Sequence, residues 1–345
     1  MNLTLSTDEA GFAALRGEWN DLLRRSRFDT IFLTWEWQTT WWRYLGATRG
    51  PLYLLAARDE EHLVGILPLY RTNNDAERTL RVVGCFEVAD YLDLIIETGY
   101  EEAVYRAFLD WLAGPDAPAW DALDLCNQPT LSLAHSRLPE LARARGWSAE
   151  VSQEDVCPVI ALPSEPSEPD LDRWEAYLAT LDKKERHEIR RKLRRVQREA
   201  PDAELRFVRG KAGLIDAVNA FIALHRLSRR DKDAFMDEQM QGFFHALAAT
   251  CAEHGWLQLS FLEVDGEPIA SYFCFEYKNE VLVYNSGYDP QAYSQLSPGW
   301  VLLARLIQEA VAQGCTRFDF LQGDEDYKHR FGGVDEAVYR TLIRR

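Results

Sequence analysis

The chain has 345 residues and a globular composition, with 47% hydrophobic and 27% charged residues. This length exceeds that of one ordinary small domain and predicts two domains. The formal net charge of −16 argues against a protein that coats nucleic acid, so we expect no DNA partner, although a local basic surface stays open. The N-terminus lacks a signal-peptide pattern, and no apolar run approaches the roughly 20 residues that span a bilayer. We therefore expect a soluble, cytoplasmic protein without a transmembrane segment.

The six cysteines are scattered along the chain and include no C-x-x-C pair. Most lie in apolar runs, so we expect structural thiols in a reducing cytoplasm rather than disulfides or zinc ligands. Neither a metal-ligand pattern nor a Ser-His-Asp pattern stands out, and we expect no metal.

The first half, residues 1–162, alternates predicted strands and helices. An N-terminal helix capped by Thr7 or Asp8 precedes an aromatic bank at helical spacing, which we interpret as core: Trp37, Trp41, Tyr44 and Leu45. Residues 51–70 read as a hairpin. Further predicted strands span 80–83, 91–96, 122–126 and 159–162, and further predicted helices span 101–112 and 138–145.

The composition changes at residues 163–172, which are rich in Pro, Ser and acidic residues and read as a linker to a second domain at 173–345. A strongly basic helix is predicted at 183–198. It is either a solvated helix balanced by acidic neighbours or a surface for a polyanion, with Arg190 and Arg194 as candidate substrate contacts. The remainder predicts helices at 213–228 and 238–254, a hairpin at 256–277, and strands at 281–284, 316–321 and 337–343.

The chain is organised around residues 285–314, where a strand runs into a polar loop and then a long amphipathic helix. Ser297 is a predicted N-cap, Pro298 suits the first helical position, and Gly314 suits the C′ position. The helix would then begin with free N–H groups at Gly299, Trp300 and Val301, an arrangement that attracts phosphate. An ordinary strand–loop–helix connection explains the same pattern without any ligand.

Two parts of the chain resemble each other, residues 52–70 and residues 257–275. Each is a strand, an acidic turn and a strand, and each precedes a strand, a helix and a strand. The order β–β–β–α–β therefore occurs twice and predicts a duplicated domain. The copies differ at the helix start, where the first has Glu101 and Glu102. Such acids satisfy the helix dipole internally and repel phosphate, so only the second copy is predicted to bind an anionic donor.

Taken in order, several stretches resemble the GCN5-related acetyltransferases, and their tandem arrangement resembles the CelD (cellulose-biosynthesis type) family, a relative of FemAB-type aminoacyltransferases. These stretches are TWEWQTTWW, LVGILPLY, HEIRRKLRR, FIALHRLSRR, GEPIASYF, SGYDPQAYSQLSPG and FDFLQGDEDYKHRFGG. The resemblance implies an α/β (α+β) fold of two tandem acetyltransferase-like domains, each a mixed sheet flanked by helices. It also implies an acyl-CoA donor, such as acetyl-CoA, and no metal.

The resemblance places the donor pyrophosphate in a loop at 288–301. The family signature is Gln/Arg-x-x-Gly-x-Gly/Ala, and this chain departs from it because Gln295 lies four residues before Gly299 and Trp300–Val301 replaces the second small residue. In FemAB-type relatives the matching loop serves an aminoacyl-tRNA end, so tRNA is a further partner that the resemblance leaves open.

Acyl transfer to an amine needs a neutral amine, a polarised carbonyl and a proton for the leaving group. Asp324 is a candidate base, Tyr327 a candidate acid, and His225 a packed histidine or a base. The FemAB resemblance implies that Lys328 holds a substrate phosphate or polarises the carbonyl. Asp319 is a further candidate that can equally be structural, and Asp289, before Pro290, most simply makes a turn.

These observations predict an N-acyltransferase that acts on an amine of a small molecule or glycan precursor, such as an amino sugar or an exopolysaccharide precursor. The alternatives are a FemAB-like aminoacyl-tRNA-dependent transferase and a non-catalytic accessory module for polysaccharide synthesis.

Overall fold

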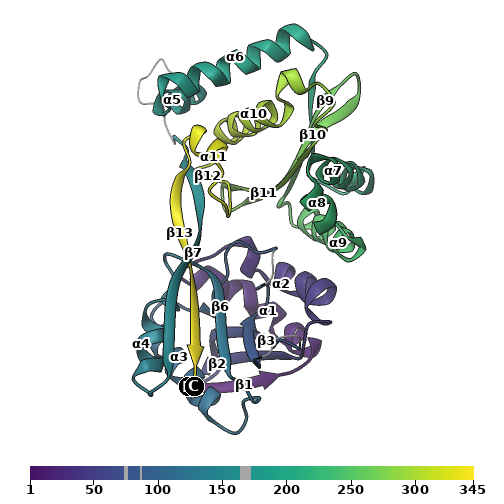
Figure 1. The fold of residues 1–345 in the computed structure, drawn as a ribbon. Helices are drawn as coiled ribbons and strands as arrows, with labels where there is room; N and C mark the ends of the chain where they lie inside the picture. The colour runs from purple at the N-terminus through teal and green to yellow at the C-terminus, as the bar shows by residue number, and fades with distance from the viewer. Residues whose placement is uncertain (74–76, 86–87, 164–171) are drawn as a thin grey trace. The chain divides into compact units, whose positions relative to one another are not determined.

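The computed structural model describes residues 1–73, 77–85, 88–163 and 172–345, which divide into two compact units (Figure 1). The first unit comprises Met1–Val156 and Glu336–Arg345, and the second comprises Cys157–Asp335. Of the predicted linker, residues 164–171 lie outside the described residues.

The first unit is a sheet with helices. Its strands are β1 (Asn2–Ser6), β2 (Leu52–Asp59), β3 (His62–Arg71), β4 (Thr79–Val82), β5 (Ile95–Ile96) and β6 (Ala122–Pro129). Its α-helices are α1 (Glu9–Arg25), α2 (Trp35–Trp41), α3 (Glu101–Ala113) and α4 (Arg137–Arg143). Asp8 caps α1 by accepting the Ala10 N–H, which confirms one of the two predicted caps.

The second unit repeats this plan with more helices. Its strands are β8 (Glu204–Val208), β9 (Leu257–Val264), β10 (Glu267–Tyr277), β11 (Glu280–Tyr288) and β12 (Arg317–Asp319). Its helices are α5 (Arg173–Thr180), α6 (Lys183–Glu199), α7 (Leu214–Ser228), α8 (Arg230–Phe235), α9 (Glu238–Glu253), α10 (Pro298–Gln313) and α11 (Asp326–Arg330). Two strands begin in one unit and end in the other, β7 (Ser148–Ala161) and β13 (Val334–Arg344).

Strand pairing is the same in both units and confirms the predicted repeat. In the first, β1, β2, β3 and β4 pair antiparallel in turn, and β4 pairs parallel with β6. In the second, β8, β9, β10 and β11 do the same, and β11 pairs parallel with β12. The helix between the parallel strands is α3 in one unit and α10 in the other.

Each sheet is completed by a strand from the far part of the sequence. Residues 338–344 of β13, at the end of the chain, pair antiparallel with β6 in the first unit. Residues 159–161 of β7, which follow the first copy of the motif, pair antiparallel with β12 in the second unit. The two copies of the motif have therefore exchanged their last strands.

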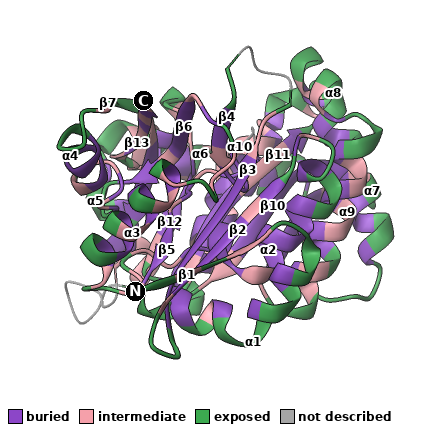
Figure 2. Cartoon of the chain, turned by 90° about the horizontal axis from the view of Figure 1, so that it is seen from below, coloured by how far each residue is buried: buried purple, intermediate pink, exposed green. Residues whose placement is uncertain are grey.

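The cores lie on the sheets, and Figure 2 shows buried residues concentrated in the strands while the outer faces of the helices are exposed. Trp37, Trp41 and Leu45 are buried, as the aromatic bank predicted, whereas Tyr44 is 42% exposed. The helix passes into a π-helical segment at Trp42–Gly46, which rotates the following side chains away from the pure α-helical spacing. The expectation that Tyr44 belongs to the core is therefore wrong.

Several elements differ from the sequence-based expectations. The strand predicted at 159–162 is the end of the longer β7, and the strand predicted at 316–321 is reduced to β12. The strand predicted at 91–96 is reduced to β5, because only Ile95 and Ile96 pair with β3. The helices α8 and α11 were not predicted, and both are too short for an apolar period to reveal.

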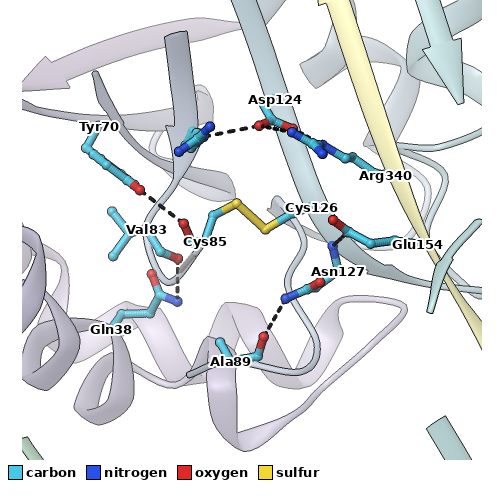
Figure 3. The surroundings of a disulfide bond; sticks show 11 residues. Gln38, Tyr70, Val83, Cys85, Ala89, Asp124, Cys126, Asn127, Glu154 and Arg340 are labelled. Atoms are coloured by element: carbon cyan, nitrogen blue, oxygen red, sulfur yellow. Dashed lines mark hydrogen bonds and ion pairs between the residues drawn. A yellow bond between two sulfur atoms is a disulfide. The ribbon is translucent and has the colours of Figure 1, made fainter. Parts of the chain in front are cut away.

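A disulfide joins Cys85 and Cys126 in the first unit, which corrects the expectation of six free thiols (Figure 3). It lies among polar contacts that fix both chain segments. The Tyr70 hydroxyl donates to the Cys85 carbonyl at 3.1 Å, and the Asn127 side chain donates to the Ala89 carbonyl at 2.5 Å. The other four cysteines are free and buried: Cys157, Cys251, Cys274 and Cys315.

Candidate functional site

The second unit contains a wedge where the parallel strands β11 and β12 separate. Their pairing ends at Leu282 and Asp319, whereas β11 continues to Tyr288. Across β10, Phe273 pairs with Asn285 and Cys274 with Val283, so Tyr284 is an extra residue that forms a β-bulge. The bulge bends β11 at the point where its partner on the other side ends.

Beyond the bulge, β11 directs backbone N–H groups toward the wedge. The Asp289 N–H donates to the Ile269 carbonyl in β10 at 3.1 Å. Because successive residues of a strand alternate the direction of their N–H groups, Ser286 and Tyr288 direct theirs away from β10. These groups can bind an extended ligand as a neighbouring strand would.

Two cavities occupy this region. One, of about 200 Å³, is lined by Tyr272, Ser286, Gly287, Tyr288, Gly299, Trp300, Leu303 and Tyr327. The other, of about 240 Å³, is lined by Tyr288, Asp289, Pro290, Ser294, Ser297, Pro298, Gly299 and Trp300. They share Tyr288, Gly299 and Trp300, so the wedge and the start of α10 border one continuous site.

The start of α10 follows the sequence only in part. Pro298 is the first helical residue, as predicted, and Gly314 ends the helix with a left-handed φ of 84°. Ser297 precedes the helix at a φ of 55° and makes no side-chain cap, which corrects the predicted N-cap bond. The Val301 N–H donates to the Ser297 carbonyl at 3.0 Å, and the Val301 side chain is in the core, so the expectation of a free N–H there is wrong.

Gly299 keeps the site open. A Cβ atom at Gly299 would meet only the Tyr288 ring, at 4.0 Å, so the space in front of the helix start is empty of protein. Gln295 is exposed in the short turn before the helix and is not among the residues that line either cavity. Asp289 makes the predicted turn, because its carboxylate accepts the Gln291 N–H at 2.8 Å.

Tyrosine side chains form much of the first cavity. Tyr272 is buried in β10, Tyr288 is at the exposed end of β11, and Tyr327 comes from α11. Burial raises the pKa of the Tyr327 phenol well above its usual range, and it raises the pKa of Tyr272 in the same direction. Both phenols are therefore protonated at neutral pH and can donate a hydrogen bond.

Lys328 is engaged by its own loop. Its ammonium group donates to the carbonyl oxygens of Leu321, Gln322 and Gly323 at 3.1, 2.6 and 3.0 Å, and it lies 2.9 Å from the Glu325 carboxylate. An ammonium has only three N–H donors, and these four acceptors occupy them. This geometry suits a lysine that fixes the loop after β12 rather than one that reaches a substrate.

The two acidic candidates of this loop lie in different environments. Asp319 is buried, and its carboxylate accepts the Leu321 N–H at 2.7 Å, where Leu321 has a left-handed φ of 56°. Asp319 therefore stabilises the sharp turn at the edge of the wedge. Asp324 is exposed on the loop and is accessible to a substrate.

Two side chains hydrogen-bond to β11, one from α7 and one from α8. His225 is buried, and its Nε2 lies 2.9 Å from the Asn285 side-chain oxygen. Burial, followed by the charge of Lys232, lowers the pKa of His225 to about 4, so the ring is neutral at pH 7. His225 does not line either cavity. These contacts are those of a packed, positioning histidine.

Lys232 is a residue that the sequence did not single out. Its ammonium group donates to the Ser286 carbonyl at 2.5 Å, at the edge of the wedge, and burial lowers its pKa to about 8. The close approach of α7 to β11 explains why Gly287 is a glycine, because a Cβ there would lie 2.3 Å from the backbone nitrogen of His225. The polar run Asn285–Ser286 at the end of an apolar strand is the signal that could have identified this contact.

The basic helix α6 lies beside the start of α10. Lys192 and Arg330 stack on the Trp300 ring at 4.5 and 4.6 Å from its centroid. Arg190 pairs with Glu175, while Arg194 is exposed on the outer face. The sequence predicted the helix correctly, but it indicated Arg190 and Arg194 rather than Lys192 and Arg330 as the residues near the site.

Comparison with known proteins shows which family the second unit resembles. Residues 183–329 match the acetyltransferase (GNAT) domain family, and this range includes the bulged strand, α10 and the loop after β12. The second unit thus contains a GNAT-like acetyltransferase region, and the protein is an acyltransferase. No curated protein sequence matches the chain.

Solved structures share the fold of the whole chain. FemX matches with a TM-score of 0.66 and 9% identity over 99% of this chain and 97% of that chain. L-PGS from Bacillus licheniformis matches with a TM-score of 0.56 and 12% identity over 98% of this chain and 92% of that chain. A tandem GNAT protein from the clavulanic acid biosynthesis pathway matches with a TM-score of 0.50 and 12% identity over 99% of this chain and 98% of that chain. At such identities the likeness concerns the fold alone, and it confirms the predicted tandem α/β architecture.

Outside the gaps at 74–76, 86–87 and 164–171, no group of three or more His, Cys, Asp or Glu side chains is placed to hold a metal ion. Over the same residues, no helix is long and apolar enough to cross a membrane.

Proposed function

We propose that the protein is an N-acyltransferase that moves an acyl group, such as acetyl, from acyl-CoA to an amine. The observation that carries this proposal is the open wedge between β11 and β12, continuous with the cavity at Gly299. A thioester donor is long and ends in phosphates. It would extend along the unpaired edge of β11, and its pyrophosphate would lie at the start of α10.

The donor end of the site would use backbone groups. The N–H groups of Gly299 and Trp300 are at the first turn of α10, where the helix dipole favours an anion. Ser297 lines the same cavity and can add its hydroxyl. Gln295 and Val301, which complete the predicted loop, would support its conformation without touching the donor. The cations Lys192 and Arg330, behind Trp300, would make the surroundings positive.

The chemical step would use the groups around the first cavity. The Ser286 or Tyr288 N–H would polarise the thioester carbonyl, and Tyr327 would donate a proton to the departing thiolate. Asp324, on the exposed loop, would accept the proton of the attacking ammonium. Lys328 and Asp319 would position that loop, while His225 and Lys232 would position β11.

The acceptor would be an amino sugar or another precursor of the cell envelope or of an exopolysaccharide, as in the CelD-type family that the sequence resembles, and the reaction would take place in the cytoplasm. Asp289 lines the cavity proposed for the donor, and Arg190 and Arg194 line neither cavity, so these three residues would not contact the acceptor. A FemAB-like transferase that uses aminoacyl-tRNA is the second candidate, favoured by the fold of FemX and by the basic α6.

The proposal is tested by calorimetry of acetyl-CoA and longer acyl-CoAs with the parent protein and with Gly299→Glu. The substitution puts a side chain and a negative charge into the open space, so the Kd for acyl-CoA should rise at least about 100-fold. Gly17→Glu is the matched control, because it adds the same charge where a Cβ meets nothing within 4 Å.

Binding by the parent and by Gly17→Glu alone would support the donor and the site. If the parent bound no acyl-CoA but bound charged tRNA, with an affinity that falls steeply with salt, the second candidate would replace the first. If it bound neither donor, the catalytic proposal would be wrong. If the parent binds acyl-CoA, turnover of Asp324→Asn tests the base, and full activity in that variant would remove Asp324 from this role.

A further inference from the structure

Helix α6 concentrates positive charge in an acidic protein. It holds nine of the 39 Lys and Arg residues and three of the 55 Asp and Glu residues, so its formal charge is +6 in a chain of −16. Its buried face is narrow, with Ile189 and Val196 in the core of the second unit. Figure 1 shows α6 on the outside of this unit, beside α10.

The outer face of α6 is a continuous basic stripe. Its exposed residues recur at intervals of three or four and so lie on one side of the helix: Lys184, His187, Arg191, Arg194 and Arg198. At 1.5 Å per residue, the helix is about 25 Å long. The stripe therefore presents four cations in a straight row, Lys184, Arg191, Arg194 and Arg198, with His187 between them.

Neighbouring acids do not neutralise the stripe. Arg191 pairs with Glu188 at 2.7 Å, Arg198 pairs with Glu199 at 2.7 Å, and Lys184 lies 3.9 Å from Glu185, which also pairs with Arg330. Glu188 is also 3.7 Å from Lys192, and Glu199 is also 3.1 Å from Arg195, so each carboxylate is shared by two cations. A net positive field therefore extends from this face into solvent.

We propose that the α6 stripe docks the protein on an anionic phospholipid surface. A straight row of cations on the outside of one unit can contact a planar surface along its whole length, and each Lys or Arg near such a surface adds to the attraction. The exposed positions carry no apolar side chain, so the helix would lie on the headgroups without inserting.

An RNA partner fits these observations less well. The rest of the chain is strongly acidic and would repel a polyanion that extended past α6 over other faces. Helix α6 also contains no Phe, Tyr or Trp on which an unpaired base could stack.

Docking would also define the class of acceptor, an extension that rests on the proposed function. Because Lys192 of α6 stacks on Trp300, which lines both cavities, a surface held by α6 would lie close to the acyl-transfer site. The acceptor would then be an amine carried by a membrane lipid.

The docking proposal is tested by co-sedimentation with vesicles in the absence of acyl-CoA, so that its failure is separate from failure of the donor proposal. One vesicle set is phosphatidylcholine alone, and the other contains about one-third phosphatidylglycerol. The test variant removes four charges from the stripe: Lys184, Arg191, Arg194 and Arg198, each →Gln. The control removes four exposed charges from the first unit: Arg24, Arg43, Arg106 and Arg143, each →Gln.

We expect the parent and the control to sediment with the anionic vesicles only, with binding that weakens as salt rises. The stripe variant should bind them at least about tenfold more weakly. Absence of binding to anionic vesicles at low salt would overturn the proposal, as would equal losses in the two variants. Stripe-dependent binding of tRNA by a protein that ignores the vesicles would also overturn it.

Discussion

The two units share one strand order and differ where their parallel strands separate. In the second unit, β11 and β12 part after Leu282 and Asp319, and the wedge opens into cavities. In the first unit, β4 and β6 part after Arg81 and Asp124. Counted from those last pairs, the Cys85–Cys126 disulfide occupies the register of Ser286 and Leu321 and closes the wedge covalently.

The helix starts differ in the same sense. At α10, Gly299 leaves open space, whereas at α3 the buried Glu101 carboxylate accepts the Gly99 N–H at 2.7 Å and pairs with Arg27 at 2.5 Å. An internal carboxylate thus occupies the place where a donor phosphate would lie. A few side chains therefore decide whether this fold carries a ligand site, and the strand order does not.

The largest effect is expected at the edge that keeps the second wedge open. Lys328→Met removes a buried cation and leaves the carbonyls of Leu321, Gln322 and Gly323 without their donor, which should cost about 3–5 kcal/mol of stability and abolish acyl-CoA binding. Urea unfolding and calorimetry measure the two effects. Lys211→Met, at a largely exposed lysine, is the control. A Lys328→Met protein that unfolded and bound like the parent would show that the lysine does not hold this edge.

The disulfide that closes the first wedge should contribute to stability alone. It bridges 41 residues in sequence, and its reduction should lower the free energy of unfolding by about 2–4 kcal/mol while leaving acyl-CoA binding unchanged. Unfolding with and without reductant measures this change. The double variant Cys85→Ser, Cys126→Ser should not respond to reductant. Loss of donor binding on reduction would mean that the two wedges do not act separately.

Removing the proton donor of the open wedge should slow the reaction without unfolding the protein. Tyr327→Phe deletes only the hydroxyl of a residue that lines the cavity, and kcat should fall by about 100-fold, with a smaller change in KM for the donor. Steady-state kinetics measure it, and Tyr44→Phe, at an exposed tyrosine of the first unit, should leave kcat unaltered. Parent-like turnover in Tyr327→Phe would assign the acid to another group.

The closed helix start of the first unit predicts a dependence of stability on pH. Burial raises the pKa of Asp93 from 3.8 to about 7, and Glu101 adds a smaller effect in the same direction. Between about pH 4 and 7 the folded state therefore holds a proton that the unfolded state releases, so this contribution is full below pH 4 and is lost as the pH rises to 7. We expect a change on the order of 4 kcal/mol.

Chemical unfolding across this pH range measures the effect, with Asp93→Asn as the comparison because its side chain stays neutral. The parent curve should fall relative to the curve of Asp93→Asn as the pH rises. Parallel curves would contradict the buried, protonated state of Asp93.

The sequence was sufficient for those features that follow from local periodicity. The two hairpins, α3, α6 and α10 have long apolar patterns or clear turns, and the repeated order exposed the duplication. The difference between Glu101 and Gly299 at the helix starts was also readable, because charge at a helix end acts locally.

Features that depend on contacts distant in sequence could not be predicted. The pairing of Cys85 with Cys126 depends on where two parallel strands separate, and the engagement of Lys328 depends on the path of the loop after β12. Similarly, Lys232 reaches Ser286 only because α8 packs near the bulged strand. The exchange of β7 and β13 could not be predicted from the local hydropathy pattern.

That exchange has a consequence for synthesis on the ribosome. Residues 336–345 complete the sheet of the first unit, with Arg340 bonded to the Asp124 carboxylate at 2.7 and 2.8 Å and Thr341 to the Gln128 side chain at 2.6 Å. Most of that unit is synthesised early, but the edge of β6 that pairs with β13 stays unpaired until β13 has been translated. The first unit therefore cannot finish folding before the second unit has been synthesised.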